Sequence, residues 1–146
     1  MIAAVEPLHR ALEVWRSQGI KVRPPADERS IIAAMAEIRR PVSRDVIALY
    51  RLLDGFEDWT TDNHIWSLWP LSRIVEEHVD ANYERPYTLF SDYCIRSHLY
   101  CFGYLSSEVS SVSIDYFDGK EPMLVAGSVA EFFETYFSEP GRLELH

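Results

Sequence analysis

The chain has 146 residues, of which 47% are hydrophobic and 25% are charged. That length suits one compact domain with a full core, and the composition excludes a disordered, collagenous or membrane-embedded protein. Twenty-three acidic against 14 basic residues give a net charge of −9, which argues against a general binder of nucleic-acid backbones, because such binding needs a basic surface.

Three helices are predicted first. Apolar residues recur at three- and four-residue steps from Val5 to Trp15, which predicts a helix that ends at Gly19. Pro24 and Pro25 interrupt the chain, and a second helix is expected from Asp27 until Pro41 ends it. The third helix is predicted to start at Ser43, with Val42 and Ile47 as a hydrophobic staple across its cap, and to close at Gly55.

A polar, acidic stretch follows, and it is predicted to be the loop 54–63. His64 to Trp69 is rich in large apolar residues and predicts a strand, which Pro70 stops. Ser72 is expected to cap the next helix. That helix is expected to face the core with Ile74, Val75 and Val79, and solvent with Glu76, Glu77 and Asp80.

From Tyr87 the hydrophobic period becomes two. The pattern predicts strands at 87–92, 99–104, 109–117 and 123–126, with a turn at Asp118-Gly119, and the short connections favour antiparallel pairing. Ser128 and Glu131 form a capping box for a last helix, rich in phenylalanine. The expected fold class is α+β: N-terminal helices, a central, mostly antiparallel sheet, and a closing C-terminal helix packed on it.

No residue pattern predicts an active site. The five histidines are scattered, so no metal site is expected, and no glycine-rich loop could cradle a phosphate. Cys94 and Cys101 lie among apolar residues, which is typical of buried, reduced cysteines, and Cys94 with His98 lacks the electropositive setting of a reactive dyad. We therefore expect a chain that is not an enzyme, with no cofactor and no metal.

The location in the cell is also predicted. The chain has no apolar stretch long enough to span a membrane, and its N-terminus lacks the basic lead and the apolar run of a secretory signal. A cytoplasmic protein is expected, with no membrane and no nucleic acid as partner.

The charge is uneven along the chain. Residues 1–51 carry a net +3 and residues 52–146 a net −12. Excess carboxylate keeps a small protein soluble, and it also steers a cationic partner to the surface. The loop 54–63 combines such carboxylates with two large aromatic residues. We name as candidate partner-binding residues Asp54, Phe56, Glu57, Asp58, Trp59 and Asp62.

Two interpretations of this loop stay open. Aromatic side chains within a ring of like charge are typical of a binding site for a basic protein surface. Alternatively, Phe56 and Trp59 simply pin the loop to the core.

The order of several motifs resembles the SUKH superfamily, the Smi/Knr-like domains of fungal cell-wall regulators and bacterial immunity proteins. The motifs are Leu52-Leu53-Asp54-Gly55 after a helix, Trp69-Pro70-Leu71 before a helix, Leu89-Phe90-Ser91-Asp92-Tyr93, Tyr100-Cys101-Phe102-Gly103, and Val125-Ala126 before the last helix. The resemblance covers residues 28–138 of a single domain 1–146, with residues 1–25 as an N-terminal helical addition. Where the family often has Asn-Gly, this chain has Asp54-Gly55, and both tolerate the turn.

The resemblance implies an α+β fold with no catalytic apparatus. For bacterial members it implies a cytoplasmic immunity protein that neutralises a toxin, often a nuclease or a deaminase, by binding it directly. A cationic toxin groove would suit the acidic surface of this chain.

Two further functions stay open. The fungal members imply a regulatory domain with a non-toxin protein partner, which could bind through Arg39, Arg40, Arg44 and Arg51 instead. The third possibility is a small-molecule site on a sheet face lined by Tyr100, Phe102 and Tyr104.

Overall fold

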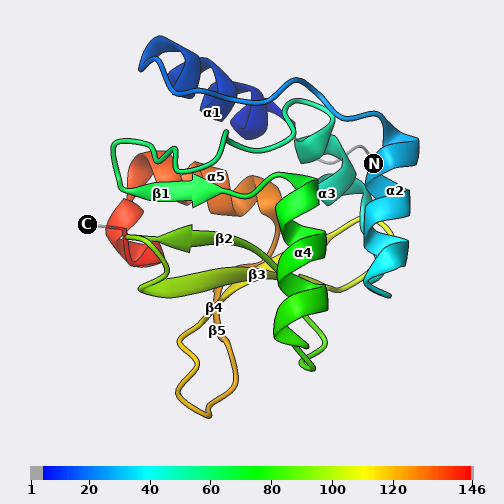
Figure 1. Cartoon of the computed structure of the whole chain (residues 1–146). Coiled ribbons are helices and arrows are strands. Elements are labelled where there is room, and N and C mark those ends of the chain that lie inside the picture. The colour runs from blue at the N-terminus through cyan, green and yellow to red at the C-terminus, as the bar shows by residue number, and fades with distance from the viewer. Residues whose placement is uncertain (1–4, 146) are drawn as a thin grey trace.

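The computed structural model describes residues 5–145, and it has the α+β fold expected from the sequence (Figure 1). A five-stranded antiparallel sheet in the order β1-β2-β3-β4-β5 lies between helices from both ends of the chain. In Figure 1, α4 lies in front of the sheet and α5 behind it. The helices are α1 (Glu6–Ser17), α2 (Glu28–Glu37), α3 (Arg44–Tyr50), α4 (Leu71–Ala81) and α5 (Val129–Ser138).

Strands β2 to β5 lie where the period of two predicts them, and β1 lies within the strand predicted at 64–69. The strands are β1 (Trp66–Leu68), β2 (Thr88–Tyr93), β3 (His98–Tyr104), β4 (Ser110–Asp115) and β5 (Met123–Ala126). A single 3-10 turn, Pro140–Leu143, follows α5. Register shifts in β2 and in β4 mark one irregularity in each of these strands.

Two of the predicted helix starts are confirmed by their caps. The carboxylate of Asp27 accepts a hydrogen bond from the backbone N–H of Ser30 (2.7 Å), and the hydroxyl of Ser128 accepts one from Glu131 (3.0 Å). Ser43 precedes α3 as predicted, but its hydroxyl makes no cap; it donates to the carboxylate of Asp45. Asp45 also accepts from two backbone N–H groups, of Ser110 (3.1 Å) and Val129 (3.2 Å), so it joins α3 to β4 and α5.

The start and the inner face of α4 differ from the prediction. The helix begins at Leu71 with Pro70 at the cap position, and Ser72 lies within it. Val79 is 62% exposed, whereas His78 is buried. The reason is helical geometry: His78 lies one turn after the buried Ile74 and on the same face, and Val79 lies a further 100° around the helix, outside the contact.

The core is continuous from α1 to the C-terminus. Trp15 of α1 is fully buried, with its ring 4.9 Å from that of Phe56 and 5.8 Å from those of Trp66 and Phe133. The helix expected as an N-terminal addition therefore contributes to the centre of the same core. Leu143 and Leu145, beyond the predicted 28–138 region, are buried too. Among residues 5–145, no helix is long and apolar enough to cross a bilayer.

Candidate functional site

The loop 54–63 is held by backbone hydrogen bonds at both ends. The N–H of Phe56 donates to the carbonyl of Leu68 (2.8 Å), and the N–H of Asp62 donates to that of Trp66 (2.9 Å), so the loop covers the outer edge of β1. On its other side, Glu57 N–H donates to the Lys21 carbonyl (2.9 Å). A loop tied in this way presents its remaining side chains in fixed positions.

The first two candidate residues serve the fold. Phe56 is 1% exposed and packs edge-on against Trp15, so its side chain offers no surface to a partner. The carboxylate of Asp54 accepts a hydrogen bond from the first N–H of α4, on Leu71 (2.8 Å). Partial burial raises the pKa of Asp54, and this hydrogen bond opposes the shift. Gly55 between them has a φ of +73°, and a Cβ there would lie 2.5 Å from the backbone of Pro70.

Asp62 is also a structural residue. Its side chain is buried, and one carboxylate oxygen accepts hydrogen bonds from the backbone N–H groups of His64 (2.8 Å) and Trp66 (3.1 Å). Burial raises the pKa of Asp62, and the two hydrogen bonds lower it in part. Asp62 therefore shapes the entry to β1 and is not available to a partner.

The other three candidates, Glu57, Asp58 and Trp59, are exposed. The Trp59 side chain is 91% exposed, which is the largest value among the exposed large hydrophobic residues that the structure describes. Trp59 lies in a four-residue turn closed by a hydrogen bond from Thr60 N–H to the Glu57 carbonyl (3.1 Å), and its φ is +64°. Turns with a positive φ at the third position favour glycine, so tryptophan there is strained.

Two hollows flank Trp59, and together we call them the Trp59 groove. The first holds about 300 Å³ and has Ile65 and Ile95 among its lining residues. The second holds about 400 Å³ and has Asp58 and Glu76 among its lining residues. Trp59, Arg73 and Arg96 line both. The walls come from the loop 54–63, the first turns of α4, and the turn between β2 and β3.

The apolar wall is built from residues with unusual backbones. Ile95 is 73% exposed and has a φ of +53°, and Ile65 is exposed with a φ of +60°. Such angles are rare for β-branched residues. The two segments are joined, because Cys94 N–H donates to the Ile65 carbonyl (2.8 Å). Backbone strain of this kind tends to gather at functional sites.

The two arginines of the groove are paired with acids of the same chain. Arg73 lies 3.4 Å from Glu77 and 3.7 Å from Asp92, and Arg96 lies 2.6 Å from Glu77. The guanidinium of Arg73 is also 4.4 Å from the centre of the Trp69 ring. Burial raises the pKa of Asp92, and the charge of Arg73 opposes that shift. In residues 5–145, no ion pair engages Glu57, Asp58 or Glu76.

Most of this groove is not predicted from the sequence, which indicates Asp58 and Trp59 as site residues but neither Ile65 nor Ile95. Ile65 follows Trp59 closely in the chain, whereas Ile95 belongs to a distant segment that the pairing of β1 with β2 brings beside it. No local pattern signals that pairing.

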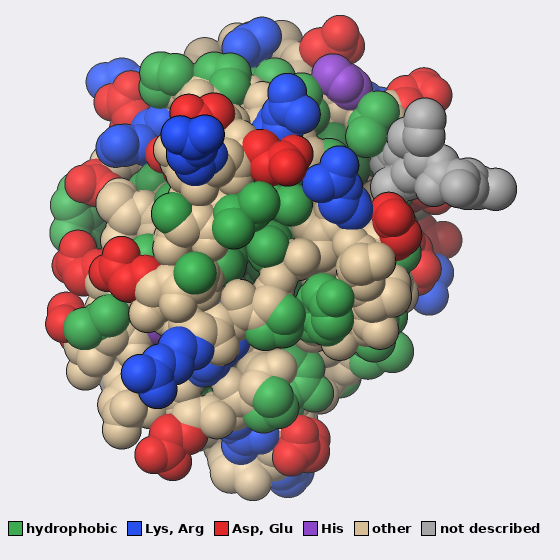
Figure 2. All heavy atoms as spheres, turned by 90° about the vertical axis from the view of Figure 1, so that its right-hand side faces the viewer, with side chains coloured by type: hydrophobic (Ala, Val, Ile, Leu, Met, Phe, Trp, Pro, Cys, Tyr) green, Lys and Arg blue, Asp and Glu red, His purple; other side chains and the backbone are tan. Residues whose placement is uncertain are grey.

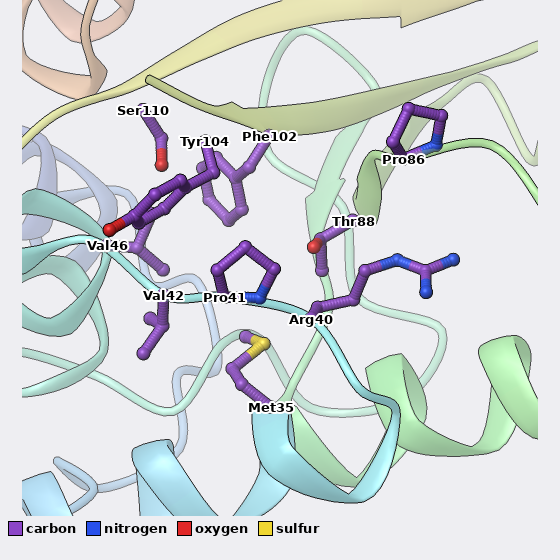
Figure 3. A pocket seen from close by; sticks show the side chains of 10 residues that line it. All are labelled: Met35, Arg40, Pro41, Val42, Val46, Pro86, Thr88, Phe102, Tyr104 and Ser110. Atoms are coloured by element: carbon purple, nitrogen blue, oxygen red, sulfur yellow. The ribbon is translucent and has the colours of Figure 1, made fainter. Parts of the chain in front are cut away.

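Figure 3 shows a different hollow, between α2, α3 and the sheet, where Phe102 and Tyr104 lie among smaller apolar side chains. It holds about 10 Å³, which is room for roughly one water molecule. Tyr100 and Phe102, from the predicted small-molecule face, are buried beneath α5 and its neighbours. The hollow beside Phe102 and Tyr104 is therefore too small for a metabolite.

The arginine-rich face is partly committed to structure. The Arg40 guanidinium donates to the backbone carbonyls of Tyr83 (2.7 Å), Arg85 (3.1 Å) and Tyr87 (2.9 Å). Arg44 lies 3.5 Å from Glu28, and Arg39 and Arg51 are exposed. Figure 2, which views the right-hand side of Figure 1 where α2 lies, shows acidic and basic groups interspersed. No continuous basic surface is visible there.

The histidines and cysteines form no metal-binding cluster in the described chain. Among residues 5–145, no three His, Cys, Asp or Glu side chains gather where a metal ion could bind. Both cysteines are free; Cys101 is buried as expected, but Cys94 is exposed, because it lies in the turn between β2 and β3. Burial raises the pKa of the Cys101 thiol, which keeps it protonated and unreactive. His146 lies outside the described residues.

Comparison with known proteins adds no relative. No protein-family model matches the chain, and no curated protein matches it. The candidate site therefore rests on the geometry of the groove.

Proposed function

We propose that this chain is a non-enzymatic protein-binding domain, and that it binds a partner with a basic surface at the Trp59 groove. The observation that carries the proposal is Trp59 itself. An indole that is 91% exposed buries nothing in the core and occupies a strained turn position, so its presence has no explanation in the stability of the fold. Tryptophan is among the residues most enriched at the centres of protein interfaces.

The charges around Trp59 support a basic partner. Glu57, Asp58 and Glu76 are exposed, and within the described chain none has an ion-pair partner, whereas Arg73 and Arg96 are each paired. A cationic surface that approached the groove would meet the carboxylates of Asp58 and Glu76, which line it, with Glu57 next to Asp58 in the loop. Such complementarity speeds association and excludes acidic partners.

The resemblance to SUKH domains adds a biological role to the proposal. In that role the chain is an immunity protein, and its basic partner is a cognate toxin, such as one that acts on nucleic acid. A regulatory role through Arg39, Arg40, Arg44 and Arg51 has less support, because Arg40 is engaged by backbone carbonyls.

The test compares two exposed positions. A photo-crosslinking residue replaces either Trp59 or, as a matched control on another edge of the molecule, Leu124, which is 64% exposed on β5. Proteins crosslinked in the host from position 59 and not from position 124 are identified and purified. We then expect Trp59→Ala to weaken binding of the purified partner roughly tenfold or more, and Leu124→Ala to leave it unchanged.

Two outcomes would contradict the proposal. One is a purified partner that binds Trp59→Ala as tightly as the wild type. The other is a partner whose association rate does not fall as salt is raised, since steering by exposed charges is screened by salt. The immunity role makes a separate prediction: the partner should arrest growth, and co-expression of the wild-type chain, but not of Trp59→Ala, should restore it.

A further inference from the structure

The two hollows of the Trp59 groove differ in chemistry. The hollow with Ile65 and Ile95 is suited to an apolar side chain, because both residues are exposed there. The hollow with Asp58 and Glu76 is suited to a cation. Trp59 lines both, as do the paired Arg73 and Arg96, so a partner side chain in either hollow would lie beside the indole of Trp59.

The acidic hollow retains negative charge after its internal pairs are counted. Arg73 and Arg96 both pair with Glu77, and Arg73 also lies within 3.7 Å of Asp92. Asp58 and Glu76 also line the hollow, and the salt bridges of residues 5–145 include neither. A guanidinium or ammonium group placed here would therefore meet two carboxylates and lie beside an indole, a ring whose face attracts cations.

The groove is already formed in the free chain. Ile65 N–H donates to the Asp62 carbonyl (3.0 Å), and the Ile65 carbonyl accepts from Cys94, so the loop and the β2–β3 turn support each other. A surface that is formed before binding loses less conformational entropy when the partner arrives.

We infer that the partner contacts this groove with an extended segment that carries an apolar side chain and an arginine or lysine on the same face, one on each side of Trp59. This inference rests on the proposed function and specifies the partner's chemistry. Side chains two residues apart in an extended chain point the same way and are about 6.6 Å apart, which is close to the breadth of an indole. The expected motif is thus apolar-x-basic, or the reverse order.

The probe is a random dodecapeptide library displayed on phage. It is selected on the wild-type chain and counter-selected on Trp59→Ala. We expect enriched peptides to carry an apolar residue and a basic residue at alternate positions. Peptides without a basic residue, or with acidic residues in its place, would overturn the inferred motif and leave Trp59-dependent binding intact.

Variants then separate the two hollows. Ile95→Ser should weaken the binding of a selected peptide roughly tenfold. The factor should be the same for a version of that peptide in which the basic residue is replaced by alanine, because the two hollows act independently. Glu76→Gln combined with Asp58→Asn should weaken the parent peptide, and should have no effect once the basic residue is replaced. Leu124→Ser and Glu13→Gln are matched exposed controls in β5 and α1, and should bind as the wild type does.

The outcomes distinguish the two proposals. If the Glu76→Gln and Asp58→Asn variant binds every peptide more weakly by the same factor, whether or not the peptide has a basic residue, the assignment of the two hollows is wrong. The groove then remains a binding surface. If no enriched peptide depends on Trp59, both the motif and the proposed surface are wrong. Far-UV and near-UV circular dichroism of each variant shows that it is folded.

Discussion

Phe56 and Trp59 lie three residues apart in one acidic loop, yet one is buried in the core and the other is almost fully exposed. Phe56 forms a bridge to Val22 and donates to Leu68, which directs its ring inward. Trp59 lies in the turn beyond, which the Thr60 N–H to Glu57 carbonyl hydrogen bond closes, and its side chain points to solvent. The contrast shows that aromatic content does not identify a binding loop; the side chain that nothing in the fold requires is the better guide.

The largest effect on the free energy of unfolding is expected at Phe56, the buried residue of this pair. Phe56→Ala should lower the free energy of unfolding by about 3–5 kcal/mol, because it leaves a cavity against Trp15 and Trp66. Urea unfolding measures the change, with exposed Leu124→Ala as a control that should shift stability by less than about 0.5 kcal/mol. A loss at Phe56 no larger than that of the control would mean that the loop does not contribute to the core.

Asp62 extends the comparison to the carboxylates. Asp62→Ala should lower the free energy of unfolding by about 1–3 kcal/mol, because it leaves the N–H groups of His64 and Trp66 without their acceptor. Asp62→Asn keeps an acceptor oxygen and removes a charge that burial penalises, so its stability at pH 7 should equal or exceed that of the wild type.

The pH dependence gives a check on Asp62. Its folded-state pKa is raised above 3.8, so the stability it contributes is present below pH 3.8 and is lost as pH rises through the folded pKa. Asp62→Asn should lack that loss. Equal destabilisation by the Ala and Asn variants would show that the carboxylate charge itself is needed.

A similar contrast exists on α4 between buried His78 and exposed Val79. His78 Nδ1 lies 2.7 Å from the Ile74 carbonyl, to which it donates, and its Nε2 accepts from Leu89 N–H (3.0 Å), so the ring is neutral. Burial lowers the pKa of His78 below 6.5, and the charge of Arg40 lowers it further. Its stability contribution is therefore full above pH 6.5 and is lost as pH falls towards the lowered pKa.

Protonation of His78 is expected to lower the free energy of unfolding by about 1 kcal/mol, which is the contribution of one hydrogen bond. Urea unfolding at pH 7.5 and pH 5.5 measures it, and His78→Gln should show a smaller difference between the two values than the wild type. Val79→Gln is the neighbouring control and should keep the full difference. An unchanged pH dependence in His78→Gln would assign it to other groups.

The smallest effect on stability is expected at Trp59, the exposed residue of the pair Phe56 and Trp59. Trp59→Gly removes a side chain that buries nothing and relieves a φ of +64°, so the free energy of unfolding should stay the same or rise by up to about 1 kcal/mol. Thermal unfolding measures this change. A clear loss of stability would mean that Trp59 is a structural residue, and it would remove the reason for assigning it to an interface.

The local signals in the sequence determined the secondary structure. Caps at Asp27 and Ser128, and the period of two from residue 87 onward, are short-range features, and the elements that they mark lie where they are predicted. Two helix ends differ: α4 begins at Leu71, before the predicted cap Ser72, and α3 ends at Tyr50, before the predicted Gly55.

The antiparallel pairing of the strands from β2 to β5 followed from short connections, since neighbouring strands joined by short turns pair directly. β1 also pairs with β2, although α4 separates them along the chain. The sequence also marked the acidic loop 54–63 and six candidate residues in it, of which three, Glu57, Asp58 and Trp59, are exposed.

Tertiary structure alone decided which of those residues face solvent and what lies beside them. The sequence pattern does not predict that Phe56 is buried and Trp59 exposed, because the burial of Phe56 depends on its contacts with Trp15 and β1, which lie elsewhere in the chain. The same holds for Ile65, Ile95 and Glu76: their local patterns indicate a strand end, a turn and a helix surface. They become one groove only because strand pairing and the packing of α4 on β2 bring three remote segments together.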